Sequence, residues 1–123
     1  MTATLPPATT APTSWTTVCR YDDLQPERGV AALVGDQQIA VFRLFDGALH
    51  AVGHRDPVSG AHVIARGIVG TRGDAPTVAS PMYKQVFDLR TGVCLDAPDD
   101  AALRLPVHPV RLRDGLVEVH AEG

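Results

Sequence analysis

Short apolar runs alternate with turn residues along the chain from Trp15 onward. The first half contains the runs WTTVC, VAALV, QIAVFRLF and ALHAVG, which are separated by PERG, GDQ and DG. Gly and Asp-Gly at such positions are typical of tight hairpin turns. Apolar and polar residues alternate only partly in VFRLF and ALHAVG, which predicts strands with one face on a core.

The second half has the same organisation, with the runs TVAS, QVFDLR and VCL followed by LPVHPVRLRDGLVEVH. In the last stretch, Arg113-Asp114-Gly115 predicts a hairpin turn between two apolar runs. No window has a long helical period, and ten prolines and eleven glycines disfavour one. Single helical turns are expected near residues 22–24 and 63–66. We therefore expect an all-β fold, an antiparallel β-sandwich or small barrel.

The chain divides into a short tail and one domain. Residues 1–14 are almost wholly Thr, Pro, Ala and Ser, a composition that predicts a disordered tail. Residues 15–121 are expected to form one domain, since the chain has 123 residues and 45% of them are hydrophobic. Its least regular part lies between Gly53 and Ser80, and irregular stretches of this length are typical of functional loops.

Charge and cysteine content narrow the classes of function. Eleven Lys and Arg against fourteen Asp and Glu give a net charge of −3, which argues against nucleic acid as a partner. No apolar run approaches the roughly 18 residues of a membrane span, and the N-terminal segment lacks signal-peptide features, so we expect a cytoplasmic protein. Cys19 and Cys94 form no Cys-x-x-Cys pair and are expected to be core residues. A redox disulfide between them requires that they lie close in space.

Histidine and serine side chains are the candidates for chemistry. His54, Asp56 and His62 offer two imidazoles and a carboxylate, a ligand set that suits non-haem iron, although their spacing matches no known metal motif. Ser80 has neither a Gly-x-Ser-x-Gly context nor a base at a recognisable offset. The chain also has no glycine-rich phosphate motif. These tests identify no catalytic residue.

Three segments, AVGHRDPVSG, SPMYKQVFDLRTGVCL and LRLPVHPVRLRDGLVEV, resemble the Rieske-type iron–sulfur domain over roughly residues 15–120. The resemblance implies an antiparallel β fold with a loop-rich subdomain of the cluster-binding type. In that family, two loops supply Cys-x-His and Cys-x-x-His, so that two thiolates hold one iron and two imidazoles hold the other.

The iron ligands of that family are missing from this sequence. Its two loop prolines match Pro57 and Pro81, and this match places the following residues at the four ligand positions: Asp56, Val58, Ser80 and Tyr83. Valine cannot coordinate iron, and serine and aspartate offer hard oxygen atoms where the cluster needs soft thiolates. We therefore expect this chain to have no cofactor and no metal of its own.

The segments VIARGIVG and VASPMYKQVFDLRTG are similar to the small subunits of assimilatory NAD(P)H-dependent nitrite reductases, which share this degenerate form. The resemblance implies a non-catalytic accessory subunit whose partner is a large subunit carrying FAD, a [4Fe-4S] centre and sirohaem. That large subunit reduces nitrite to ammonium with electrons from NAD(P)H. Two alternatives stay open: a freestanding Rieske-like interaction or regulatory module, and an electron-transfer protein with atypical metal ligands.

A docking role predicts where the partner interface lies. Tyrosine and arginine are enriched at binding hot spots, and the two loops carry several polar residues at their tips. We expect the interface to include Arg55, Asp56, Tyr83, Lys84 and Gln85. Tyr83 has a second interpretation, in which its ring fills the space that a cluster would occupy.

Overall fold

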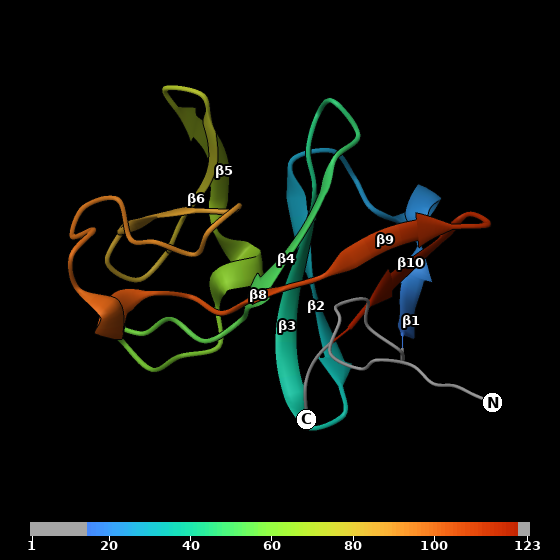
Figure 1. The fold of residues 1–123 in the computed structure, drawn as a ribbon, viewed down its shortest axis with the longest axis horizontal. Helices are drawn as coiled ribbons and strands as arrows, with labels where there is room; N and C mark the ends of the chain where they lie inside the picture. Colours follow the sequence, from blue (N-terminus) through green and yellow to red (C-terminus); the bar gives the residue numbers. More distant parts are fainter. Residues whose placement is uncertain (1–14, 121–123) are drawn as a thin grey trace, which may run out of the picture.

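Three antiparallel sheets and three short 3-10 helices form the fold of residues 15–120, which are the residues that the computed structural model describes (Figure 1). The all-β expectation is confirmed. The tail expected over residues 1–14, and the last residue of the domain expected to end at 121, lie outside the described residues. Within residues 15–120, no helix has the length and apolar character needed to cross a membrane.

A four-stranded sheet forms the centre of the molecule. Its strand order is β2-β3-β4-β8, with β2 at Arg28–Val34, β3 at Gln37–Arg43, β4 at Leu49–Gly53 and β8 at Val107–His108. Four successive residues of β3, Ile39 to Phe42, are completely buried. Because successive side chains of a strand point to opposite faces, β3 has a core on each side. The expectation of one core-facing side was therefore wrong for this strand.

One face of the central sheet packs against a three-stranded sheet of order β1-β10-β9, with β1 at Thr16–Arg20, β9 at Val110–Arg113 and β10 at Leu116–Val119. Ile39 and Val41 share this core with Val117 and Val119. The predicted hairpin between β9 and β10 is confirmed. Asp114 and Gly115 have φ values of 55° and 79°, and positive φ at both central positions is the signature of a type I′ turn.

The opposite face packs against the sheet β5-β6-β7, with β5 at Ile68–Arg72, β6 at Ala75–Ala79 and β7 at Val86–Asp88. Phe42 and Val52 of the central sheet meet Val78 and Phe87 in this second core. Together with its loops, this sheet forms a small lobe, on the left in Figure 1. The 3-10 helices η2 (Tyr21–Asp23), η3 (Ile64–Arg66) and η4 (Ala101–Leu103) complete the fold, and the first two match the expected helical turns.

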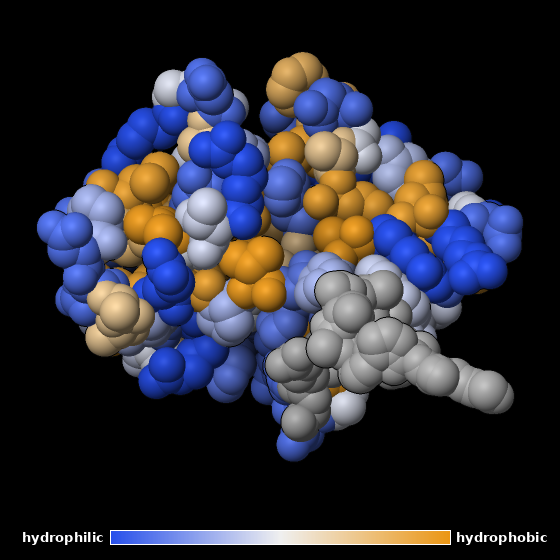
Figure 2. Space-filling model, viewed as in Figure 1, coloured by the Kyte–Doolittle hydropathy of each residue, from blue (hydrophilic) through white to orange (hydrophobic). Residues whose placement is uncertain are grey.

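The two lobes separate at one end of the molecule. A groove of about 680 Å³ lies there between residues 26–29 and residues 65–69, and Figure 2 shows the hollow between the lobes. Arg28 and Arg66 line it together with Ile68, whose side chain is exposed. Polar and apolar side chains are therefore mixed along this groove.

The chain leaves the small lobe along a tight turn at Gly92, which has a φ of 80°. The amide of Gly92 donates to Asp88 O at 2.7 Å, and its carbonyl accepts from the amide of Leu105 at 2.8 Å. Leu105 is buried, and the chain continues from it to β8 at the edge of the central sheet. Gly92 thus fixes the path of residues 104–108 from the small lobe to the central sheet.

Candidate functional site

Two loops of the small lobe contain the positions that the sequence singled out. The first loop (residues 54–62) follows β4, and the second loop (residues 80–85) joins β6 to β7. Pro57 lies in the first loop and Pro81 in the second. Both loops begin where a buried strand ends, so the scaffold fixes where each loop starts.

The first loop is closed by its own backbone. Arg55 and His62 form an isolated antiparallel bridge, and the amide of Asp56 donates to Ala61 O at 2.8 Å. The amide of Gly60, which has a φ of 81°, donates to Asp56 O at 2.7 Å. These main-chain contacts join the two ends of the loop.

The second loop is a single turn closed by main-chain hydrogen bonds. The amide of Ser80 donates to Gln85 O at 2.9 Å, and the amide of Lys84 donates to Ser80 O at 2.9 Å. The Ser80 hydroxyl oxygen accepts from the amide of Met82 at 3.2 Å. The side chains of residues 82–84 are exposed, so the tip of this turn faces solvent.

A buried hydrogen bond joins the two loops. The hydroxyl of Ser80 donates to Oδ2 of Asp56, and both residues are almost completely buried. Oδ1 of Asp56 accepts from the amides of Val58 at 2.7 Å and Ser59 at 3.3 Å. The Asp56 carboxylate therefore accepts hydrogen bonds from donors in both loops. Asp56 and Ser80 are the two positions that match the cysteines of cluster-bearing relatives.

These hydrogen bonds determine the charge state of Asp56. Burial by itself raises the pKa of a carboxyl group. The hydrogen bonds from the Ser80 hydroxyl and from the amides of Val58 and Ser59 outweigh burial, and they hold the pKa of Asp56 below its usual value. Asp56 is thus a buried, ionised group whose charge is compensated by donors of the two loops.

The four residues at the ligand positions do not fit a [2Fe-2S] cluster. Asp56 and Ser80 are hydrogen-bonded to each other and to amides of the two loops. The side chain of Val58 has no donor atom, and Tyr83 is 59% exposed at the tip of the second loop. Because such a cluster needs two thiolates and two imidazoles converging on one point, this donor set cannot hold it.

The alternative iron site at His54, Asp56 and His62 is also not formed. Nδ1 of His54 accepts from the amide of Ala65 at 3.1 Å, while the Asp56 carboxylate is occupied by Ser80 and its own loop. Among the described residues, no group of three or more His, Cys, Asp or Glu side chains is arranged to hold a metal ion. Cys19 and Cys94 are unpaired and belong to the two different cores.

The expected interface residues differ in exposure. Arg55, Tyr83 and Lys84 are exposed, whereas Asp56 is completely buried and cannot contact a partner directly. Gln85 is half-buried, and its Oε1 has no hydrogen-bond partner among residues 15–120. The interpretation in which Tyr83 fills a vacated cluster space is wrong, because its side chain is mostly exposed.

Two exposed apolar residues at the same tip were not included in the expected interface. Val58 is 40% exposed in the first loop and Met82 is 47% exposed in the second. We use the term "loop tip" for the exposed residues Val58, Met82, Tyr83 and Lys84. The only sequence signal for Val58 and Met82 was their position next to Pro57 and Pro81.

Lys84 combines two unusual features. It is the only lysine of the chain, and its φ of 63° places it in the left-handed region. Residues other than Gly, Asn and Asp seldom adopt this conformation, which costs a lysine about 1 kcal/mol. In the Rieske-type motif Cys-Pro-x-His-Gly, glycine stands at this position, so Lys84 replaces a residue that adopts positive φ without strain.

We expect Lys84→Gly to raise the free energy of unfolding by about 0.5–1 kcal/mol, because glycine adopts positive φ without strain. Lys84→Ala is the matched control, since it removes the charge but keeps a Cβ in the left-handed conformation. Urea unfolding of both variants measures the difference. Equal stability of the two variants would show that backbone strain at residue 84 is negligible.

Known proteins resemble this chain over almost all of its described length. The Rieske-like [2Fe-2S] domain matches residues 14–120. The nitrite reductase (NADH) small subunit of Escherichia coli (strain K12) is 35% identical over 106 residues, which are 85% of this chain and 95% of that protein. A crystal structure described as an NADH-dependent nitrite reductase small subunit from Mycobacterium tuberculosis is 49% identical with a TM-score of 0.83, covering 89% of this chain and 96% of that one.

A further relative has a different organisation. The nitrite reductase [NAD(P)H] large subunit of Klebsiella oxytoca is 36% identical over 105 residues, which are 85% of this chain but 11% of that protein. The segment similar to this chain is therefore a small part of a much longer polypeptide.

Proposed function

Because the chain belongs to the nitrite reductase small subunits of the Rieske-like [2Fe-2S] domain family, we propose that it docks through its loop tip onto a nitrite reductase large subunit. In this role it is an accessory subunit that contributes a binding surface and no redox centre. The observation that carries the proposal is the loop tip itself, which has lost the ligands but presents a rigid, exposed surface.

The loop tip has the composition of a binding surface. Val58, Met82 and Tyr83 are 40%, 47% and 59% exposed, and Lys84 adds a positive charge beside them. Tyrosine and methionine are enriched in protein interfaces, and tyrosine frequently supplies hot spots. The buried pair Asp56–Ser80 below the tip holds the two loops together, so little entropy is lost when a partner binds.

The Klebsiella oxytoca large subunit supports this partner. A segment similar to this chain is there covalently part of a large subunit. When equivalent segments exist both as a separate chain and as part of a longer one, the separate chain is expected to bind the remainder of the longer one.

The chemistry of the proposed complex belongs to the large subunit. We propose that the large subunit carries FAD, a [4Fe-4S] centre and sirohaem, and that it reduces nitrite with electrons from NAD(P)H. This chain supplies no electron-transfer step, because its loops hold neither thiolate nor imidazole at the ligand positions. The cytoplasm is the location we propose, which agrees with two unpaired cysteines.

Binding is tested with the purified large subunit from the same genome and the double variant Tyr83→Ala/Lys84→Glu. Removing a hot spot costs about 2 kcal/mol, so we expect Kd to rise about thirtyfold or more. The matched control is Phe45→Ala/Arg113→Glu, which removes an exposed aromatic ring and reverses one charge outside the two loops. Calorimetry measures both affinities.

The control is expected to bind within twofold of the unchanged chain. Nitrite-dependent NAD(P)H oxidation is then measured with and without the chain, which relates binding to the activity of the complex. Absence of any binding between the unchanged chain and the large subunit would sink the proposed function and favour a freestanding module. Unchanged affinity of the double variant would instead move the interface away from the loop tip.

A further inference from the structure

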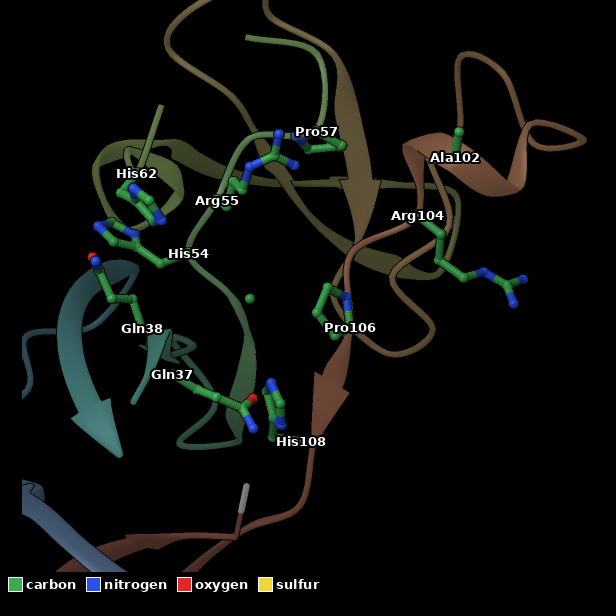
Figure 3. A pocket seen from close by; sticks show the side chains of 11 residues that line it. Gln37, Gln38, His54, Arg55, Pro57, His62, Ala102, Arg104, Pro106 and His108 are labelled. Carbon is green, nitrogen blue, oxygen red and sulfur yellow. The ribbon is translucent and has the colours of Figure 1, made fainter. Parts of the chain in front are cut away.

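A cleft of about 330 Å³ lies beside the first loop, between that loop, the start of β3 and the segment that leads into β8. Figure 3 shows its side chains. His54 and His62 lie next to each other at one end with Gln38, and His108 lies at the other end with Gln37. Arg55 and Arg104 belong to the same lining, and the Arg104 side chain extends outward. We call this feature the histidine cleft.

The histidine cleft has basic and neutral side chains but no acidic one. Two arginines and three histidines line it, and none of its lining residues is Asp or Glu. The chain as a whole has a net charge of −3, so this concentration of basic groups runs against its overall charge. A cleft of one sign with low-dielectric walls focuses the electric field on whatever enters it.

In the described part of the chain, three arginines outside the cleft form ion pairs and the two arginines of the cleft do not. Arg72, Arg90 and Arg111 form ion pairs with Asp96, Asp88 and Glu118. Among the described residues, neither Arg55 nor Arg104 has an ion pair or a side-chain hydrogen bond, and both are exposed. Their guanidinium groups therefore remain free to bind a carboxylate from outside the chain.

His54 adds a donor that is already oriented. Its Nδ1 accepts from the amide of Ala65 at 3.1 Å, so the ring proton of the neutral imidazole is on Nε2. The residue is only 6% exposed, and the ring is held in place by its surroundings. Burial is the main cause that lowers the pKa of His54, and the neighbouring His62 and Arg66 lower it further.

We propose that the histidine cleft receives an acidic segment of the nitrite reductase large subunit, with Arg55 and Arg104 as the principal contacts. This inference rests on the proposed function, because it names the charge of the partner surface. His54, Arg55 and Pro57 line the cleft and also form the start of the first loop. The cleft is therefore continuous with the first loop. Val58 of the loop tip directly follows Pro57 in the first loop, so the cleft and the tip share this loop.

The single lysine of the chain allows a direct test by carbodiimide cross-linking, which joins an amine to a carboxylate in direct contact. In the variant Lys84→Arg/Arg104→Lys, the only lysine lies at the cleft. In the matched control Lys84→Arg/Arg113→Lys, the only lysine lies at the end of β9, a strand that contributes no lining residue to the cleft. Each variant is mixed with the purified large subunit, and the linked peptides are identified by mass spectrometry.

We expect the lysine introduced at position 104 to link to an Asp or Glu of the large subunit, with a yield at least fivefold above that of the control. A second measurement uses charge reversal without chemical modification. Arg55→Glu/Arg104→Glu and the control Arg20→Glu/Arg113→Glu change the net charge equally, and all four arginines are exposed. We expect the cleft variant to raise Kd at least tenfold and the control to change Kd less than threefold.

Ionic strength gives a further criterion. The affinity of the unchanged chain is expected to fall between about 50 and about 300 mM salt, and that of the cleft variant to fall much less.

Equal cross-linking or equal affinity loss in the cleft and control variants overturns the cleft proposal. If Tyr83→Ala/Lys84→Glu still weakens binding in that case, the proposed function stands alone. If the unchanged chain does not bind the large subunit, both proposals fail.

Discussion

Replacing Asp56 with alanine is expected to lower the free energy of unfolding by about 3 kcal/mol, because a buried donor that loses its acceptor costs about 1–3 kcal/mol. The change leaves the Ser80 hydroxyl and the amides of Val58 and Ser59 without their acceptor. Urea unfolding followed by circular dichroism measures the loss. Amide hydrogen exchange shows where it acts, and we expect the largest loss of protection in the two loops.

Two further variants separate the contact between the loops from burial alone. Ser80→Ala removes one donor and is expected to cost about 1–2 kcal/mol. In a double-mutant cycle, the combined variant is expected to be more stable than the sum of the two changes predicts, because both changes remove the same hydrogen bond. Asp99→Ala is the surface control and is expected to change stability by less than about 0.5 kcal/mol. Strict additivity would contradict a direct contact between Asp56 and Ser80.

The same carboxylate makes stability depend on pH. Burial raises the pKa of Asp56, but the hydrogen bonds from Ser80, Val58 and Ser59 lower it further, so the folded pKa lies below the unfolded value of about 3.9. Asp56 therefore contributes its full stabilisation above the unfolded pKa, and this contribution is lost as pH falls through the folded pKa. We expect the stability difference between the unchanged chain and Asp56→Asn to be full near pH 7 and to shrink below about pH 4.

The second large effect is expected at Gly92. Replacing it with alanine is predicted to lower the free energy of unfolding by about 3 kcal/mol. A Cβ at this position would lie 2.0 Å from the carbonyl oxygen of Leu105 and 3.2 Å from Cγ2 of Val107. The φ of 80° adds a strain of about 1 kcal/mol, and the displacement of packed backbone adds about 1–3 kcal/mol. Thermal and urea unfolding measure the loss.

Gly73→Ala separates the two causes. Gly73 also has a positive φ, 62°, but no atom lies within 4 Å of a Cβ placed there. We expect Gly73→Ala to lower the free energy of unfolding only by the strain of about 1 kcal/mol. If both variants lose the same stability, the close approach of Gly92 to Leu105 contributes nothing. Because Arg104, Pro106 and His108 line the histidine cleft, Gly92→Ala is also expected to weaken binding of the large subunit.

The sequence predicted the elements that depend on local chemistry. Asp114-Gly115 predicted its turn because positive φ at both positions has a recognisable residue preference. Pro57 and Pro81 located the two loops by resemblance, and the residues beside them showed that the cluster ligands were absent. The strand β3 was misjudged because a short apolar run has the same appearance whether one or both faces are buried.

The site depended on contacts that no local pattern records. Asp56 and Ser80 are 24 positions apart, and only the folded chain shows that the carboxylate is buried under the loop tip instead of exposed on it. Arg104 and His108 reach the histidine cleft from a segment about 50 residues beyond His54. The strain at Lys84 became visible only when its φ was known.

The double-sided burial of β3 limits how this protein can be divided or transplanted. Ile39 and Val41 belong to one core and Ala40 and Phe42 to the other, so neither lobe keeps a complete interior without this strand. A fragment that carries only the two loops would expose the apolar side of its sheet. We therefore expect the proposed docking surface to be transferable to another polypeptide only as the whole domain, and the segment of the Klebsiella oxytoca protein that is similar to this chain has that extent, matching 105 residues.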